Sequence, residues 1–244
     1  MARFFVSPEE LSGNFLTLTG ENAAHCKVLR IKRGDTITLC DGGGNECQCT
    51  VSDVSPGQVS LVVASRESSQ TEARLMVRIY MAFAKSDKLE HVIQKATELG
   101  ACEIIGFPSA RCVSLPDAKS LERKLDRWRK IAASAAEQSG RGRIPAVRAL
   151  SSFQEAVADA AQAELPIIFY ENEHQRTLSS LLQQAGTLQS VSILTGPEGG
   201  LTTQEVQQAQ DAGLISCSLG RRILRCETAP LCALSAIMYA AGEF

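Results

Sequence analysis

The chain lacks any uninterrupted apolar run close to the roughly 20 residues that cross a bilayer. Its first eight residues contain too few apolar side chains in a row to resemble a signal peptide. We therefore expect a cytoplasmic protein with no membrane partner. Hydrophobic residues make up 44% of the 244 residues and charged residues 21%, which is the balance of a globular protein with a sizeable core.

Metal-binding patterns are also missing. The sequence has no C-x-x-C pair, and its three histidines, at positions 25, 91 and 174, lie far apart along the chain. We therefore expect no metal site. The nine cysteines are odd in number and irregularly spaced, which favours reduced, mostly buried thiols over disulfides. Within a strand, Cys47 and Cys49 would point to the same face.

A general excess of positive charge is absent, because the net charge is −2. The positive residues are nevertheless clustered in three places: Lys27, Arg30, Lys32 and Arg33; Arg141 and Arg143; and Arg221, Arg222 and Arg225. Such clusters attract a phosphate backbone locally. Solvated surface charge is an equally good interpretation of any one cluster taken alone.

The chain changes character near residue 69. Residues 1–68 alternate short Val, Ile, Leu and Thr runs with turn signals, which predicts a small β-barrel. The polar stretch around 69–74 lacks periodicity and is interpreted as a linker. From residue 75 to 244, apolar strand-like runs alternate with helical patterns, which is typical of parallel βαβ units in an α/β domain. The expected strands are 75–83, 103–107, 166–170, 190–196 and 214–220.

Three helices can be predicted with their ends. The first follows residue 86, where Ser86 is expected to cap it, and it ends at Gly100. The second covers 120–138 and carries Trp128 on its apolar side, where we expect a core position. The third runs from about residue 227 to 241, and Glu227 is a candidate for its cap.

Ligands of open α/β sheets bind beyond the carboxyl ends of the strands. Three such ends carry polar or glycine-rich sequence, at 170–173, 196–200 and 220–228. We expect them to form the walls of one pocket.

The loop GPEGG, at 196–200, joins a strand to a helix start. Thr202 and Glu205 match the T-x-x-E capping box, so the next helix should begin near residue 201. A glycine-rich turn before a helix often binds phosphate. This loop has no lysine and contains Glu198, which disfavours a phosphate or nucleotide-phosphate ligand. A loop whose backbone binds a neutral or cationic ligand and a tight turn without a ligand both remain open.

Two motifs together identify a family. LTGPEGGLTTQEV at 194–206 and LGRRILRCETAPLCALS at 219–235 closely resemble the C-terminal sequence of the bacterial E-type small-subunit rRNA methyltransferases of the SPOUT superfamily, which methylate N3 of a uridine in 16S rRNA. RFFV, HCKVLRIKRGD, AFAKSDKLEHVIQKATELGACEIIGF and AAEQSGRGRIP are also similar to that family. The resemblance therefore covers nearly the whole chain, in order.

The resemblance implies a deep trefoil knot in the C-terminal α/β domain, a PUA-like N-terminal barrel and a homodimer. It also implies S-adenosylmethionine as the methyl donor, with S-adenosylhomocysteine as the product. Main-chain groups would bind this cofactor, with apolar side chains packed on its adenine ring. The predicted residues are Leu194, Thr195, Gly196, Pro197, Gly199, Gly200, Leu219, Gly220, Ile223, Leu224, Arg225, Thr228 and Ala229. Because the ligand has no phosphate and carries a positive sulfur, Glu198 is compatible with it.

Methylation at N3 requires removal of the N3 proton, by a general base or by cations that stabilise the uracil anion. Arg225 and Arg141 are the predicted catalytic cations, because arginine stays charged and offers several donors. Glu198 is the predicted base, with Glu227 as a second candidate.

The implied partner is 16S rRNA, within the assembled or assembling small ribosomal subunit. The predicted RNA-binding residues are Arg3, Lys27, Arg30, Lys32, Arg33, Arg143 and Arg222. Two alternatives remain open: a related enzyme that methylates the ribose 2′-hydroxyl, and a non-catalytic RNA-binding assembly factor.

Overall fold

The computed structural model describes residues 2–244. The chain divides into two compact units. The first unit contains the residues up to Glu72 together with Ala136–Ile144, and the second contains Ala73–Ala135 and Pro145–Phe244. The sequence analysis expected all residues after 74 to form one domain. In the structure, Ala136–Ile144 belong to the first unit instead.

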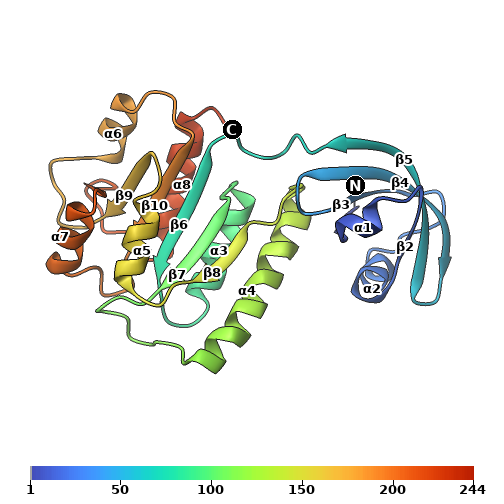
Figure 1. Ribbon diagram of the computed structural model, residues 1–244, viewed down its shortest axis with the longest axis horizontal. Coiled ribbons are helices and arrows are strands. Elements are labelled where there is room, and N and C mark those ends of the chain that lie inside the picture. Colours follow the sequence, from blue (N-terminus) through green and yellow to red (C-terminus); the bar gives the residue numbers. More distant parts are fainter. Residues whose placement is uncertain (1) are drawn as a thin grey trace. The chain divides into compact units, whose positions relative to one another are not determined.

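The first unit is built on a five-stranded mixed sheet (Figure 1). Its strands, in the spatial order β1-β3-β4-β5-β2, are β1 (Ala2–Phe5), β3 (Thr36–Cys40), β4 (Asn45–Ser55), β5 (Gln58–Ser68) and β2 (Phe15–Leu18). β1 is parallel to β3, and the other pairs are antiparallel. Within the described residues no ladder joins β1 to β2, so the sheet is open where a closed barrel was expected. Two short helices, α1 (Pro8–Leu11) and α2 (Gly20–Val28), were not predicted.

Alternating strand residues make the core of the first unit. Phe4, Ile37, Leu39 and Leu61 are almost completely buried in one cluster. The side chains of Cys47 and Cys49 are buried in the same cluster, which confirms that they share a face of β4. The core therefore comes from the β-rich pattern that the sequence shows.

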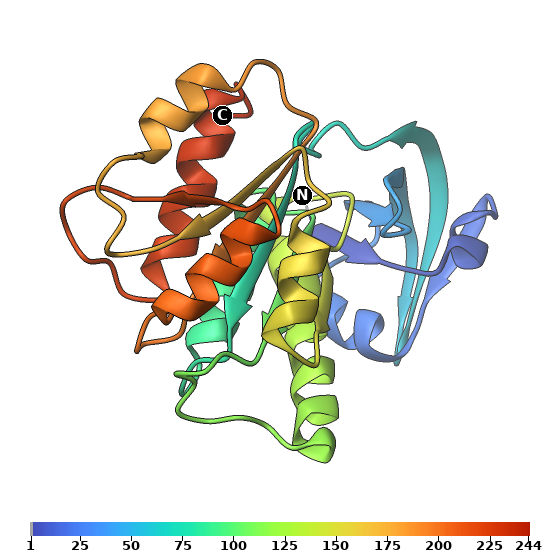
Figure 2. The same cartoon turned by 60° about the vertical axis from the view of Figure 1, so that its left-hand side comes forward.

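The second unit contains a six-stranded, all-parallel sheet (Figures 1 and 2). Its strands, in the order β11-β9-β10-β6-β7-β8, are β11 (Ile215–Cys217), β9 (Leu165–Phe169), β10 (Ser190–Thr195), β6 (Met76–Ala82), β7 (Glu103–Phe107) and β8 (Ala146–Ala149). Five of these strands were predicted, and the parallel βαβ arrangement is confirmed. β8, with the sequence AVRA, was missed because it has only four residues and contains an arginine.

Helices cover both faces of this sheet. α5 (Phe153–Ala160) and α7 (Thr203–Asp211) pack on one face, around Tyr80, Ile168 and Leu194. α3 (Lys88–Glu98) and α8 (Thr228–Ala240) pack together behind the sheet in the view of Figure 2. The remaining helices are α4 (Ala118–Ser139) and α6 (Leu178–Gln184).

The helices correct two of the predicted caps and confirm the other predictions made for them. Ser86 does not cap α3, because its φ of 58° lies in the left-handed region whereas a capping residue takes an extended conformation. Glu227 stands at the N-cap position of α8 but makes no capping hydrogen bond with its side chain. Gly100, with φ of 93°, follows the last turn of α3 as expected. α4 covers the predicted range, and Trp128 is buried.

Candidate active site

Three loops of the second unit enclose one pocket at the carboxyl edge of the parallel sheet. β9, β10 and β11 are neighbours in this sheet, so the loops that follow them meet at the same edge. The pocket has a volume of about 540 Å³, and residues of the loops 169–174, 195–201 and 218–226 line it. The predicted convergence of the three loops is confirmed.

Most of the residues predicted to bind the cofactor lie on the wall of this pocket. They are Thr195, Gly196, Pro197, Gly199, Gly200, Leu219, Gly220, Ile223, Leu224, Arg225 and Ala229, and Glu198 and Arg222 also line it. Leu194 is fully buried in β10 directly before the loop. Thr228 is exposed at the start of α8 and is not among the lining residues.

Two glycines of the 196–200 loop are required for different reasons: Gly196 packs against the backbone of Gly200, and Gly200 has a left-handed backbone conformation. Gly200 has φ of 68°, and a Cβ placed on it would lie 2.6 Å from Oε1 of Glu171. A Cβ on Gly196 would lie 2.9 Å from the carbonyl carbon of Gly200. Any side chain at either position would therefore change the shape of the loop or displace a neighbour.

The capping box after this loop is formed as predicted. The Thr202 hydroxyl accepts a hydrogen bond from the backbone N–H of Glu205, and the Glu205 carboxylate accepts one from the backbone N–H of Thr202 at 2.8 Å. The same carboxylate accepts from the backbone N–H of Ala110, also at 2.8 Å. α7 thus begins at a fixed position beside the pocket.

Arg111 ties a fourth loop to the pocket, and the sequence did not indicate it. Its guanidinium donates to the carbonyl oxygens of Gly199, at 2.9 Å, and Leu201, at 3.3 Å. Arg111 follows β7, which ends at the same edge of the sheet as β10. Its place after a strand of the parallel sheet is the one feature of the sequence that could have indicated Arg111.

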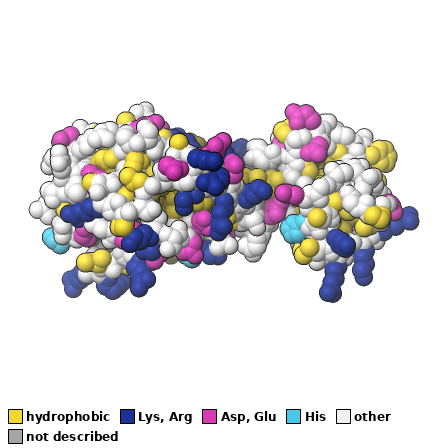
Figure 3. Space-filling model, turned by 90° about the horizontal axis from the view of Figure 1, so that it is seen from below, with side chains coloured by type: hydrophobic (Ala, Val, Ile, Leu, Met, Phe, Trp, Pro, Cys, Tyr) yellow, Lys and Arg dark blue, Asp and Glu magenta, His cyan; other side chains and the backbone are white. Residues whose placement is uncertain are grey.

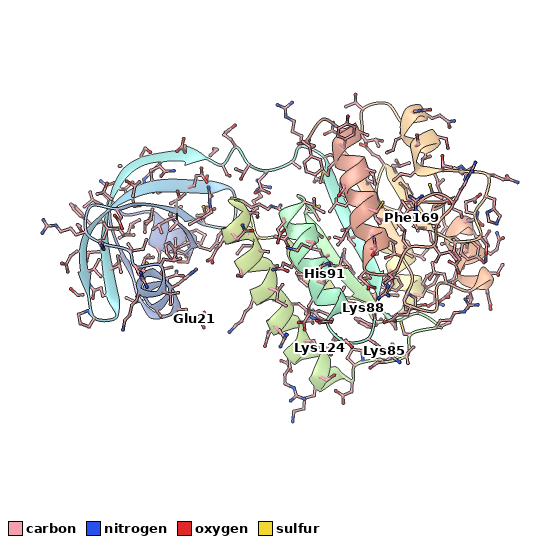
Figure 4. All side chains as sticks on the ribbon, turned by 180° about the vertical axis from the view of Figure 1, so that it is seen from behind. Glu21, Lys85, Lys88, His91, Lys124 and Phe169 are labelled. Atoms are coloured by element: carbon pink, nitrogen blue, oxygen red, sulfur yellow. The ribbon has the colours of Figure 1, made fainter. Side chains whose placement is uncertain are left out.

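Lys88 is a second residue that sequence reasoning missed. Its Nζ lies 3.1 Å from Oε1 of Glu198 and 3.6 Å from Oε2 of Glu227, and it lines the pocket. Figure 4 shows Lys88 with Lys85 at the start of α3. β6 ends beside β10, so the residues that follow β6 could have been included among the expected pocket walls.

These contacts shift the ionisation of the acids. Burial alone would raise the pKa of Glu198, but the backbone N–H groups of Glu198 and Lys85 and the Lys88 ammonium bring it below its ordinary value. Burial is likewise outweighed at Glu227, whose pKa is lowered by its own backbone N–H, the Cys226 thiol and Lys88. Burial raises the pKa of Cys226 to about 12. Both carboxylates are therefore ionised, and the thiol is neutral, at neutral pH.

Arg225 faces the same pocket from the loop before α8. Its side chain is exposed, and it is near enough to Glu227 to contribute to the lowered pKa of that carboxyl. Among residues 2–244 it has no ion-pair partner in the structure. The guanidinium is thus available to a ligand.

The other predicted catalytic cation lies in the first unit. The side chain of Arg141 is only 6% exposed and forms an ion pair of 2.7 Å with Glu72. Arg3, predicted to bind RNA, is also engaged in the first unit, where it donates to Glu46 at 2.5 Å. Either arginine would have to break its ion pair before it could bind a phosphate or a nucleobase.

The remaining predicted RNA-binding residues of the first unit are accessible. Lys27, Arg30, Lys32, Arg33 and Arg143 are exposed. Lys and Arg side chains stand out from the surface of this unit in Figure 3, beside exposed hydrophobic side chains. Val28 and Leu29, which are exposed, lie within the same stretch of sequence.

No helix among residues 2–244 combines the length and the apolar character that a membrane span requires. In the same residues, no group of His, Cys, Asp and Glu side chains is arranged to hold a metal ion. All nine cysteines lie in the described part of the chain and are free thiols, five of them buried.

Comparison with known families defines the class of protein first. Residues 71–238 match the RNA methyltransferase domain, and residues 18–64 match the RNA methyltransferase PUA domain. The two units thus correspond to a PUA-like mixed β domain and an α/β methyltransferase domain, as the sequence predicted.

Comparison with individual proteins then identifies the family within this class. The chain is 40% identical to ribosomal RNA small subunit methyltransferase E of Bacillus subtilis, over 91% of this chain and 89% of that protein. It is 34% identical to the protein of the same name from Synechocystis, over 96% and 76% of the two chains. The crystal structure of ribosomal RNA small subunit methyltransferase E from Neisseria gonorrhoeae, bound to S-adenosyl methionine, matches with a TM-score of 0.87 and 32% identity, over 98% and 97% of the chains. This chain belongs to the ribosomal RNA small subunit methyltransferase E family.

Proposed function

We propose that this protein transfers a methyl group from S-adenosylmethionine to N3 of a uridine in 16S rRNA and releases S-adenosylhomocysteine. The observation that carries the proposal is the pocket formed by the three loops after β9, β10 and β11. It occurs in a chain whose relative from Neisseria gonorrhoeae was solved with S-adenosyl methionine bound.

The residues of the pocket fit this cofactor. Its volume of about 540 Å³ is in the range of small-molecule sites. Backbone of the 196–200 loop is open to the cavity because its glycines carry no side chain. The ionised Glu198 would repel a phosphate but attract a positive sulfur. When bound, S-adenosylmethionine supplies a methyl group activated by that positive sulfur.

The protein must also make uracil N3 nucleophilic. Glu198 and Glu227 have lowered pKa values, which makes them weak bases at neutral pH. We therefore favour stabilisation of the uracil anion by the charge of Arg225, which lines the pocket and has no ion-pair partner within residues 2–244. Glu198 would serve mainly to hold the cationic cofactor.

The first unit would hold the RNA. Lys27, Arg30, Lys32 and Arg33 are exposed on one short stretch of chain and suit contacts with phosphates. Arg222, at the pocket, would meet the RNA near the target uridine. A substrate in the small ribosomal subunit implies a cytoplasmic location.

We further propose that the protein is a homodimer and that its C-terminal domain contains the trefoil knot implied by its family. Tyr239 and Phe244, both large and strongly exposed, support a subunit contact near the C-terminal end of α8. Size-exclusion chromatography with light scattering measures the dimer directly, and a monomer at all micromolar concentrations would contradict it.

The activity is tested with RNA from a strain in which the gene is deleted. Primer extension combined with mass mapping of 16S rRNA should reveal the loss of one base methyl that blocks Watson–Crick pairing, and the purified protein with S-adenosylmethionine should restore it. Loss of a ribose methyl would instead show a 2′-hydroxyl methyltransferase. Failure of calorimetry to detect S-adenosylmethionine binding would favour a non-catalytic assembly factor.

A further inference from the structure

A small charged cluster at the pocket joins three separate segments of the second unit. Lys88 begins α3, Glu198 lies in the loop after β10, and Glu227 precedes α8. The Lys88 ammonium is within 3.1 Å of the first carboxylate and 3.6 Å of the second. One cation is therefore shared by two acids that belong to different loops.

This cluster is shielded from water better than the other charges around it. The side chains of Lys88, Glu198 and Glu227 are only 28%, 24% and 19% exposed. The arginines of the neighbouring loop, Arg221, Arg222 and Arg225, are exposed, as are Glu171 and His174 on the opposite loop. Solvent therefore screens the interactions of those groups with a ligand more strongly than those of the cluster.

The cluster also carries an unbalanced charge. Two ionised carboxylates and one ammonium sum to −1, because the pKa values of both acids are lowered and that of Lys88 is raised, first by its hydrogen bond to Glu198. Without Lys88 the same carboxylates would sum to −2. The amount of negative charge next to the pocket thus depends on this one lysine.

The two ligands of the proposed reaction differ by one charge at sulfur. The methyl donor carries a positive sulfur, and after the methyl group leaves, the sulfur of the product is a neutral thioether. A fixed negative charge near the ligand therefore stabilises the donor complex more than the product complex. An ammonium beside that charge reduces the difference.

We propose that Lys88 is a positioning residue that partly neutralises the Glu198–Glu227 pair and thereby sets how strongly the pocket prefers the cationic cofactor over its neutral product. The proposal rests on the proposed function, because it takes S-adenosylmethionine and S-adenosylhomocysteine as the two ligands. It concerns their relative affinity and does not depend on the identity of the methylated uridine.

The test is calorimetric titration of the full-length protein with each ligand separately. Lys88→Met should increase the preference for S-adenosylmethionine over S-adenosylhomocysteine by about fivefold, the size expected for one partly screened charge a few ångströms away. Glu198→Gln should decrease the preference by a similar factor. Sinefungin, which has a protonated amine in place of the sulfonium, should follow S-adenosylmethionine in each variant.

Two control variants separate charge from packing. Lys88→Arg keeps the cation and should leave the preference close to that of the wild type. Lys95→Met makes the same change on the same helix, where Lys95 pairs with Glu98 at 2.8 Å and does not line the pocket. It should alter neither affinity.

The proposal is overturned if Lys88→Met lowers the affinity for both ligands by the same factor, because Lys88 would then only stabilise the positions of the loops. If Lys88→Met does not fold, Glu198→Gln carries the test, and an unchanged preference in that variant also overturns the proposal. Absence of binding by the wild-type protein would refute the proposed function itself. That result appears before any variant is measured, so the two failures are distinguishable.

Discussion

Arg225 is the residue on which the proposed chemistry depends. Arg225→Gln should lower kcat by about 100-fold, the usual cost of losing one group that stabilises an anionic transition state, while cofactor affinity changes little. Because the lost cation would have lowered the pKa of uracil N3–H, the rate should recover as the pH rises. The measurement is the pH dependence of single-turnover methylation of 16S rRNA.

Arg222→Gln is the matched control, since Arg222 lines the same pocket and is also exposed. It should weaken RNA binding and leave the pH profile unchanged. A profile for Arg225→Gln that is parallel to that of the wild type would argue against the anion-stabilising role.

Arg141 allows its two possible roles to be separated. Arg141→Gln removes the charged partner of Glu72, which should destabilise the first unit by about 1–3 kcal/mol, because the carboxylate keeps only the backbone N–H groups of Gly142 and Arg143. Denaturant unfolding measures this loss, with the exposed Arg143→Gln as a control. Normal stability with a large fall in kcat would instead support the catalytic role that the sequence suggested.

At the scale of residues, the site residues that could be predicted are those that lie within a continuous sequence motif. The glycine loop and the arginine-rich loop are each continuous in sequence, and their convergence was predicted because each follows a strand of a parallel sheet. Lys88 and Arg111 were missed because their partners lie about 90 to 140 residues away along the chain, and no local sequence pattern reports such contacts. Tertiary packing alone brings Lys88 and Arg111 to the pocket.

At the scale of elements, α7 depends on one buried acid. Glu205 is 8% exposed and accepts hydrogen bonds from Thr202 and Ala110. Glu205→Gln should therefore cost about 1–3 kcal/mol of unfolding free energy at neutral pH. Burial alone would raise the pKa of Glu205, but these hydrogen bonds lower it below 4.5.

The pH dependence follows from that direction. The stabilisation by ionised Glu205 is complete above its unfolded pKa and is lost as the pH falls through the lower folded value. The difference between wild type and Glu205→Gln should therefore shrink below about pH 4.5. Urea unfolding at several acidic pH values measures it, with exposed Glu122→Gln as the control. A constant difference would contradict the assignment.

Some helix ends and strands could not be predicted, because they depend on backbone conformations that the residue types do not report. The capping box of α7 was recognised because Thr202 and Glu205 have the required spacing. Ser86 has an equally suitable side chain, yet its positive φ places it in a turn, and nothing in its residue type reports that angle. β8 is too short for a period to be visible, and its strand geometry comes from pairing with β7.

At the scale of the whole molecule, the buried and half-buried thiols predict that the protein is less stable at alkaline pH. Burial raises the pKa of Cys40, Cys217 and Cys226 to about 12 and that of Cys49 to about 11, from an ordinary 9.0. Well below pH 9.0 each thiol is neutral in both the folded and the unfolded state, so the thiols make stability independent of pH there. Above it the unfolded chain loses protons first, and stability should fall until the folded values are reached.

Denaturant unfolding between pH 8 and pH 11, with a reductant present, measures this decline. Cys49→Ala should reduce its slope, because one shifted thiol is removed. The exposed Cys232→Ala should not change the slope. Equal slopes for all three proteins would show that the thiols do not drive the effect.

The path of the chain has a consequence for how this protein can be divided or recombined. Because the first unit is completed by Ala136–Ile144, a single cut after Glu72 would remove the partner of the Glu72 carboxylate along with eight neighbouring residues of that unit. No one breakpoint yields two whole folding modules. An exchange of the RNA-binding module between genes would therefore need two coordinated crossovers, or a graft that carries the returning segment with it.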